Sequence, residues 1–334
     1  DIQTKMTYEL SPKHRLTVIG IMGWDQIAIK PEDAVDQKLN MYNDLTILQN
    51  TLGLDWQYIW GNNGYSNTSF SHSVTKYDFG LKETRYFAET GNEKVILDQF
   101  SSQQEFRLRN VNHYSIHRQL KLNVGLESKY LIADFNNYYG PYYDVLGNPT
   151  PELSVIGKST GLKLHGFISF NWRPFSRLSL IPAVRIGHFS YNGNRHFSPR
   201  FSASYQLTEK TTLNFSTGIY YQNLPLVLLE QNEMNKNIPD PRSRHLVLGM
   251  GHLLTESTQL TVEVYDKAYT DMPADLTQPE LFLIDEVYYT GLFLPHGPLS
   301  GGGQANARGI EIMIQKKLAE SLYGMVSTSL FRSR

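Results

Sequence analysis

The stretch RGIEIMIQKKLAESLYGMVSTSLF, residues 308–331, decides the fold class of this chain. Apolar and polar residues largely take turns on both sides of a short break at 319–321. A period of two is typical of a β-strand that has one apolar and one polar face. The alternation of the first run is carried by Ile310, Glu311, Ile312, Ile314, Gln315, Lys317 and Leu318.

The same period of two recurs along the whole chain, and helical spacing is nowhere sustained. It predicts fourteen strands, most of them longer than the five or six residues usual in globular proteins. The segment 64–87 alternates poorly, so we expect a bend or a bulge there. The expected strands cover residues 1–10, 15–24, 44–60, 64–87, 102–113, 118–135, 158–172, 177–190, 196–207, 211–222, 243–254, 258–270, 306–318 and 321–332.

The connections between these strands alternate between two kinds. Tight turns such as SPKH and GNNG are followed by longer, irregular segments, several of them rich in Pro and Tyr. A tilted strand needs about 9 to 11 residues to cross a bilayer, which most of these strands provide. Short turns at one rim and long loops at the other are typical of outer-membrane barrels, with the turns in the periplasm and the loops outside the cell. The long segments are 25–43, 88–101, 136–157, 223–242 and 271–305.

Composition narrows the class of protein further. The 334 residues carry a formal net charge of −1, so no basic balance points to nucleic acid. Cysteine is absent, which rules out disulfides and thiolate chemistry. No run approaches the 18 or so apolar residues of a transmembrane helix. The sequence has no GxSxG, HExxH or phosphate-binding glycine motif, so we expect no enzyme activity, no metal and no cofactor.

Three stretches resemble consecutive barrel hairpins of TonB-dependent outer-membrane receptors, in the style of the Bacteroidetes. Their order is more specific than any single motif. They are SPRFSASYQLTEKTTLNFSTGIYYQNLP (198–225), SRHLVLGMGHLLTESTQLTVEVYDKAYTDMP (243–273) and GGGQANARGIEIMIQKKLAESLYGMVSTSLFRSR (301–334).

This resemblance implies an all-β fold, an antiparallel transmembrane β-barrel of twenty-two strands in the outer membrane. It also implies a plug domain and energy supplied by the TonB complex of the inner membrane. We expect residues 1–334 to be a barrel-domain fragment of about fourteen strands without the plug. With periplasmic turns, both ends of the segment would lie outside the cell, unlike those of a complete barrel. The alternative is that the strand assignment is off by one at each end.

Aromatic residues in the expected outer loop 136–157 are the candidate ligand contacts. A tyrosine ring can stack on a sugar or an aromatic siderophore, although the same rings also suit an interfacial girdle or a loop that packs on itself. Inward-facing charged residues, among them Glu127, Arg185 and Arg200, are expected to solvate the lumen, with a lesser role in guiding an anionic ligand. The candidate ligand-binding residues are Tyr138, Tyr139, Tyr142, Tyr143 and Gln222.

The favoured function is active import of a scarce nutrient, namely a siderophore, a cobalamin-like molecule or an oligosaccharide. The expected partners are the TonB complex through the plug, the nutrient ligand and outer-membrane lipid, with a surface lipoprotein as a further candidate. One alternative is a passive fourteen-stranded porin or channel. Another is a soluble β-sandwich that binds carbohydrate, in which the apolar face would pack against a second sheet rather than lipid.

Overall fold

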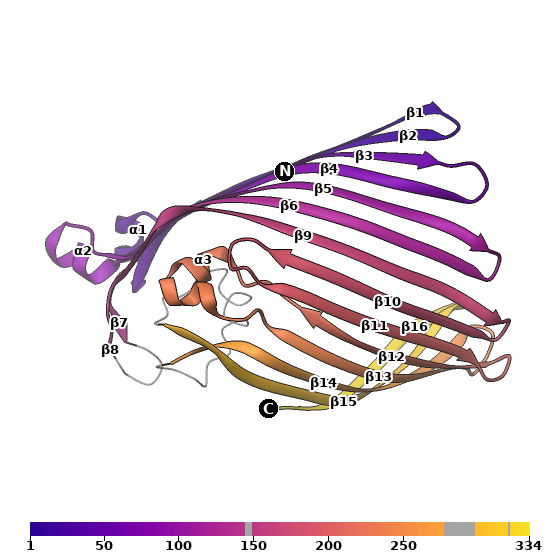
Figure 1. Ribbon diagram of the computed structural model, residues 1–334. Coiled ribbons are helices and arrows are strands. Elements are labelled where there is room, and N and C mark those ends of the chain that lie inside the picture. Colours follow the sequence, from indigo (N-terminus) through magenta and orange to yellow (C-terminus); the bar gives the residue numbers. More distant parts are fainter. Residues whose placement is uncertain (144–148, 277–297, 320) are drawn as a thin grey trace.

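The computed structural model describes residues 1–143, 149–276, 298–319 and 321–334. Among these residues, fourteen strands form one antiparallel sheet whose spatial order follows the chain (Figure 1). The strands of this sheet are β1 (Ile2–Ser11), β2 (His14–Ala28), β3 (Met41–Ile59), β4 (Gly64–Glu83), β5 (Val95–His117), β6 (Leu120–Tyr139), β9 (Leu153–Phe175), β10 (Leu178–Phe189), β11 (Arg195–Gln206), β12 (Thr211–Tyr221), β13 (Arg242–Leu253), β14 (Thr258–Asp275), β15 (Leu299–Ala319) and β16 (Leu322–Ser333).

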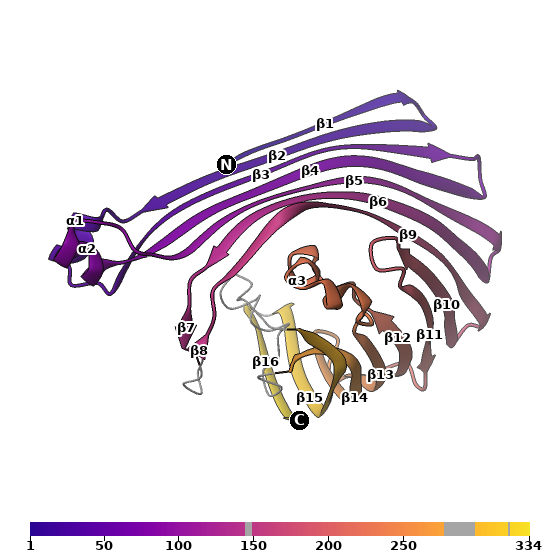
Figure 2. The ribbon, with the colours of Figure 1, turned by 60° about the vertical axis from the view of Figure 1, so that its left-hand side comes forward.

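The sheet is a curved wall with a concave and a convex face (Figure 2). In the described residues, β1 and β16 are each paired on one side only, so the wall is open rather than closed. The only other sheet described is the short pair β7 (Tyr142–Tyr143) and β8 (Pro149–Thr150). A carbohydrate-binding sandwich needs a second packed sheet, so this fold excludes that alternative.

Strand register confirms the faces that the alternation predicts. Val264 of β14 lies opposite Ile310 of β15, and Glu263 lies opposite Glu311. The apolar row belongs to the convex face, where Val264 is 50% exposed. Side chains two apart share a face, so β14 and β15 present apolar residues outward and polar residues inward.

The two rims of the wall differ. The rim with short connections, such as 118–119 and 176–177, we call the turn rim. The opposite rim, which we call the loop rim, carries the longer connections and the helices (Figure 1). The helical elements are α1 (Pro31–Asp36), α2 (Thr84–Thr90), α3 (Leu226–Glu230) and the 3₁₀ helix η1 (Glu233–Asn237). None of the described helices is long and apolar enough to span a membrane.

The structure corrects several strand boundaries. The expected strand 64–87 ends at Glu83, and α2 begins at Thr84. Several strands also continue into the expected loops; β5 begins at Val95 and β6 ends at Tyr139. The alternation weakens in these extensions because the concave face is covered by the apolar core there, so apolar side chains also point inward. In β6, for example, Phe135 and Asn137 share the concave face and are both buried, whereas Asn136 between them is exposed.

The apolar core lies on the concave side of the wall, near the loop rim. Residues 223–241, which we call the inner loop, carry α3 and η1 into this position (Figure 2). Burying a leucine side chain contributes about 1.5 to 3 kcal/mol, so this core ties the loop to the wall. The fully buried apolar side chains of the core include Phe135, Phe189, Leu224 and Leu229.

Candidate functional site

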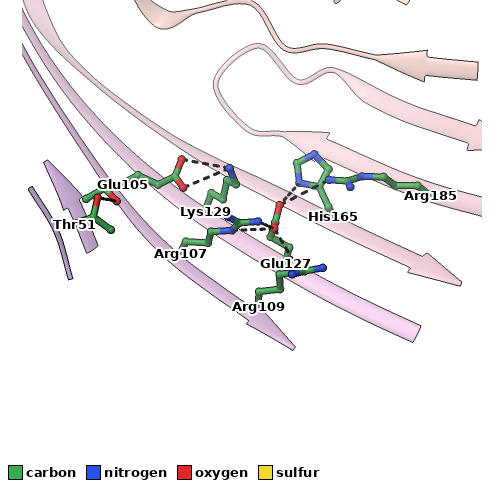
Figure 3. A network of polar contacts seen from close by, with 9 residues as sticks. Thr51, Glu105, Arg107, Arg109, Glu127, Lys129, His165 and Arg185 are labelled. Carbon is green, nitrogen blue, oxygen red and sulfur yellow. Dashed lines mark hydrogen bonds and ion pairs between the residues drawn. The ribbon is translucent and has the colours of Figure 1, made fainter. Parts of the chain in front are cut away.

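A cluster of charged side chains lies on the concave face across β5, β6, β9 and β10 (Figure 3). All its members have odd residue numbers, and the register of these four strands brings odd positions onto the same face. Strand pairing alone therefore brings these side chains together on one face. This concave cluster consists of Glu105, Arg107, Arg109, Glu127, Lys129, His165 and Arg185.

Glu127 is the centre of the concave cluster. Arg107 donates hydrogen bonds to its carboxylate, one of them from Nε to Oε2 at 2.9 Å. Arg109 Nε lies 4.0 Å from Oε2, and Arg185 Nη2 lies 3.8 Å from Oε1. His165 Nδ1 also lies 3.8 Å from Oε1. One carboxylate that is 13% exposed thus contacts three guanidinium groups.

The concave cluster carries an excess of positive charge. Its second carboxylate, Glu105, lies 3.4 Å from Lys129 Nζ. Three arginines and one lysine therefore face two carboxylates, which leaves a net charge of +2 with the histidine neutral. Partly exposed ion pairs contribute little to stability, about 0 to 1 kcal/mol each. Their combined field attracts anions to this part of the wall.

A glycine leaves space beside the cluster. Gly125 precedes Glu127 on the concave face, and a Cβ atom there would overlap the ring of Phe167 on β9. The ring can lie over β6 only because the glycine lacks a side chain. This close approach fills the wall next to Glu127 with an apolar ring.

The inner loop is fixed to the wall through Glu230. Ser159 of β9 and Tyr191 of the β10–β11 turn both donate a hydrogen bond to Glu230 Oε1. Burial and the neighbouring Glu230 raise the pKa of the Tyr191 hydroxyl. The hydroxyl therefore stays protonated and continues to donate at neutral pH.

Asp240 fixes the other end of the inner loop. Its buried carboxylate accepts a hydrogen bond from Asn223 Nδ2 at 2.6 Å and one from Asn192 Nδ2 at 3.3 Å. His196 Nε2 of β11 lies 2.8 Å from Oδ2. Asn235 of η1 ties the middle of the loop to β15, because the backbone N–H of Leu299 donates to its Oδ1 at 3.0 Å. The loop is thus attached to strands far apart in the sequence.

A cleft of about 390 Å³ lies between the inner loop and the wall. Pro225 and Leu226 form its loop side, while Glu105 and Lys163 line its wall side. Glu105 also belongs to the concave cluster, so the cleft and the cluster are continuous. Ser73, Thr75 and Gln103 also line the wall side, so the cleft offers hydrogen-bonding groups beside a smaller apolar surface, as a site for a small polar ligand would need.

The predicted ligand residues lie outside this cleft lining. Tyr138 and Tyr139 are the last residues of β6 rather than part of an irregular loop. Tyr138 donates to Glu152 Oε2 at 3.0 Å, whereas Tyr139 is 3% exposed and accepts a hydrogen bond from Gln99 Nε2 at 2.7 Å. Gln222 is exposed at the end of β12. Tyr142 and Tyr143 form β7, and their side chains lie outside the described part of the structure.

Sequence reasoning missed the inner loop and its anchors. A signal was present in LPLVLLE, residues 224–230, where apolar residues follow one another without alternation after a proline. Such a run is too apolar for an exposed loop and predicts burial. Of the concave cluster, Glu127 and Arg185 were expected to face inward. Their contact across β9 depends on strand register, which the pattern of single strands does not give.

Comparison with known families gives one match along nearly the whole chain. A family model described as TonB dependent receptor-like, beta-barrel matches residues 19–330. No curated protein sequence matches significantly.

Solved structures resemble this fold closely despite low sequence identity. The outer membrane transporter YddB from Escherichia coli has a TM-score of 0.69 at 10% identity, and the alignment covers 98% of this chain and 47% of that one. The siderophore receptor PiuA from Acinetobacter baumannii has a TM-score of 0.68 at 11% identity, covering 98% and 55%. The copper transporter OprC has a TM-score of 0.68 at 11% identity, covering 99% and 52%. This chain spans about half the length of these proteins.

Proposed function

Because this chain belongs to the TonB dependent receptor-like β-barrel family, we propose that it forms part of the wall of a receptor that actively imports a scarce nutrient. The location of such a wall is the outer membrane. In lipid every backbone N–H and C=O needs a partner, which a sheet provides by strand pairing. The convex face, with apolar side chains such as Leu248 at 56% exposure, suits contact with lipid.

The observation that carries the proposal is the charged concave face. An excess of positive charge around Glu127 continues into the cleft beneath the inner loop. This arrangement favours an anionic cargo, such as a siderophore chelate, over a neutral oligosaccharide. PiuA is described as a siderophore receptor and OprC as a copper transporter, so this fold serves more than one cargo.

The wider arrangement of the receptor follows from the same proposal. Residues 1–334 would belong to the barrel domain, a separate plug domain would meet the concave face, and the TonB complex would act on that plug. Three finer points stay predictions from the sequence: a cobalamin-like cargo, a surface lipoprotein partner and a receptor of the Bacteroidetes type. So do ligand contacts by the loop-rim residues Tyr138, Tyr139, Tyr142, Tyr143 and Gln222.

An uptake assay tests this function. The complete receptor containing this chain would be expressed in cells that lack their own receptors, with and without TonB. We expect uptake of a labelled anionic ferric chelate only where TonB is present. Uptake that persists without TonB would support the passive channel instead.

Variants test the role of the concave cluster in the same assay. Arg109→Gln with Arg185→Gln removes the two guanidiniums that contact Glu127 most loosely. We expect chelate uptake to fall several-fold, while Arg177→Gln, in the turn between β9 and β10, leaves it unchanged. Equal uptake by both variants at equal surface abundance would show that the concave cluster does not contribute to transport.

A further inference from the structure

The convex face near the loop rim carries arginines where lipid-facing residues are expected. Arg244 lies two residues before Leu246 on β13, and Arg308 lies two residues before Ile310 on β15. Residues two apart share a face, so both arginines point outward with these apolar side chains. Asp266 on β14 lies directly opposite Arg308. The outer arginine cluster, as we call it, consists of Arg242, Arg244, Asp266, Arg308 and Arg332.

The height of the outer arginine cluster matches the edge of the apolar band. On β15 the outward residues between Arg308 and Lys316 are Ile310, Ile312 and Ile314. The eight steps from Arg308 to Lys316 span about 26 Å along the strand at roughly 3.3 Å per residue. A tilt of about 40° reduces this to a height of about 20 Å, close to the apolar band of outer-membrane barrels. Arg308 therefore lies at the headgroup level on the loop-rim side.

The arginines of the cluster are not neutralised. Arg308 Nε lies 2.5 Å from Asp266 Oδ1, and Arg244 Nη2 lies 3.6 Å from Oδ2. The two arginine side chains are still 71% and 64% exposed. Each guanidinium has five N–H donors, which one shared carboxylate cannot satisfy. Arg244 and Arg308 thus share the single carboxylate of Asp266.

We propose that the outer arginine cluster binds phosphate groups in the headgroup of an anionic lipid of the outer leaflet. Guanidinium groups match phosphate oxygens in pairs, and basic clusters beside an apolar span attract anionic lipids. The acyl chains would then lie on Ile310, Ile312 and Ile314 below. This lipid site faces away from the cleft and the concave cluster, so it is independent of the imported nutrient.

Native mass spectrometry of the complete receptor in detergent tests the site. The probes are diphosphorylated lipid A, the same lipid without its phosphates, and inorganic phosphate alone. We expect retention of the diphosphorylated lipid, with at least a fivefold loss in the double variant Arg244→Gln, Arg308→Gln. Lys158→Gln is the matched control, because Lys158 is an exposed cation that already pairs with one carboxylate, Asp134, at 3.1 Å. Circular dichroism checks that each variant keeps its sheet.

Asp266→Asn separates lipid binding from a purely internal ion-pair role. It keeps both arginines and raises the positive charge, so we expect the diphosphorylated lipid to be retained at least as well as by the wild type. Loss of lipid in this variant would overturn the proposal. Equal retention of the lipid without phosphates would overturn it too, as would inorganic phosphate binding as tightly as the lipid.

Discussion

Ile312→Arg places a charge in the middle of the apolar band of β15. Ile312 lies four residues from Arg308 and four from Lys316, about 13 Å along the strand from each. An arginine on the lipid face at the bilayer midplane costs about 2 to 4 kcal/mol, falling to about 0 to 1 near the interfaces. We therefore expect Ile312→Arg to lower the free energy of unfolding by about 2 to 4 kcal/mol.

Glu311→Arg is the matched control on the concave face. Glu311 directly precedes Ile312, so it lies at nearly the same depth, and it is paired with Glu263. The new pair of opposite charges is favourable by about 0.2 to 1 kcal/mol, so the change should be neutral or slightly stabilising. The two variants then differ by at least about 2 kcal/mol, which is roughly a 30-fold difference in the folding equilibrium constant.

The measurement is guanidinium unfolding of the complete receptor folded into phosphatidylcholine vesicles, followed by tryptophan fluorescence. The reasoning requires that only Ile312→Arg shifts the unfolding midpoint to lower denaturant. Equal shifts in the two variants, or a larger shift for Glu311→Arg, would show that the convex face of β15 does not meet lipid.

The inner loop gives three further predictions. Leu229→Ala creates a cavity at a fully buried position, which costs about 2 to 5 kcal/mol, and we expect faster hydrogen–deuterium exchange in residues 223–241 while the wall is unchanged. Asp240→Ala leaves its half-buried partners Asn192, His196 and Asn223 without this carboxylate at a cost of about 1 to 3 kcal/mol, so limited proteolysis should cut the loop; an uncut loop would contradict this anchor. The pKa of Tyr191 is raised in the folded state. Its hydrogen bond to Glu230 therefore stabilises the docked loop fully below the ordinary tyrosine pKa of about 10, and this stabilisation is lost as pH rises through the folded pKa. Relative to the intrinsic, base-catalysed exchange of free amides, protection of the loop should fall only at alkaline pH, and Tyr191→Phe should remove that pH-dependent step.

The strand pattern and its faces could be predicted from the sequence because lipid on one side imposes a period of two. Ile310, Ile312 and Ile314 alternate with polar residues, and the structure places them on the convex face as expected. The inner loop could not be placed in the same way. Its apolar run shows that Leu226 and Leu229 are buried, but not which strands cover them. That information lies in contacts between distant segments rather than in any local period.

The candidate site shows the same division between local and distant information. The alternation of polar and apolar residues alone predicted that Glu127 and Arg185 face inward. Their contact depends on the pairing of β6 with β9 and of β9 with β10. The tyrosines at the end of β6 looked like loop residues because alternation fades where strands leave the bilayer. Tyr139 instead packs into the core, where its hydroxyl accepts from Gln99.

The anchors of the inner loop also imply an order of assembly. Glu230 contacts Ser159, 71 residues earlier, and Asn235 contacts Leu299, 64 residues later. Contacts this distant form slowly, because the intervening chain must be ordered before they can close. The wall from β9 to β15 must therefore take shape before the loop can dock. Until the loop docks, the four adjacent apolar residues 226–229 stay exposed near the loop rim of the incomplete sheet. A chaperone that shields this segment during insertion would protect the step at which the unfinished wall is most prone to aggregate.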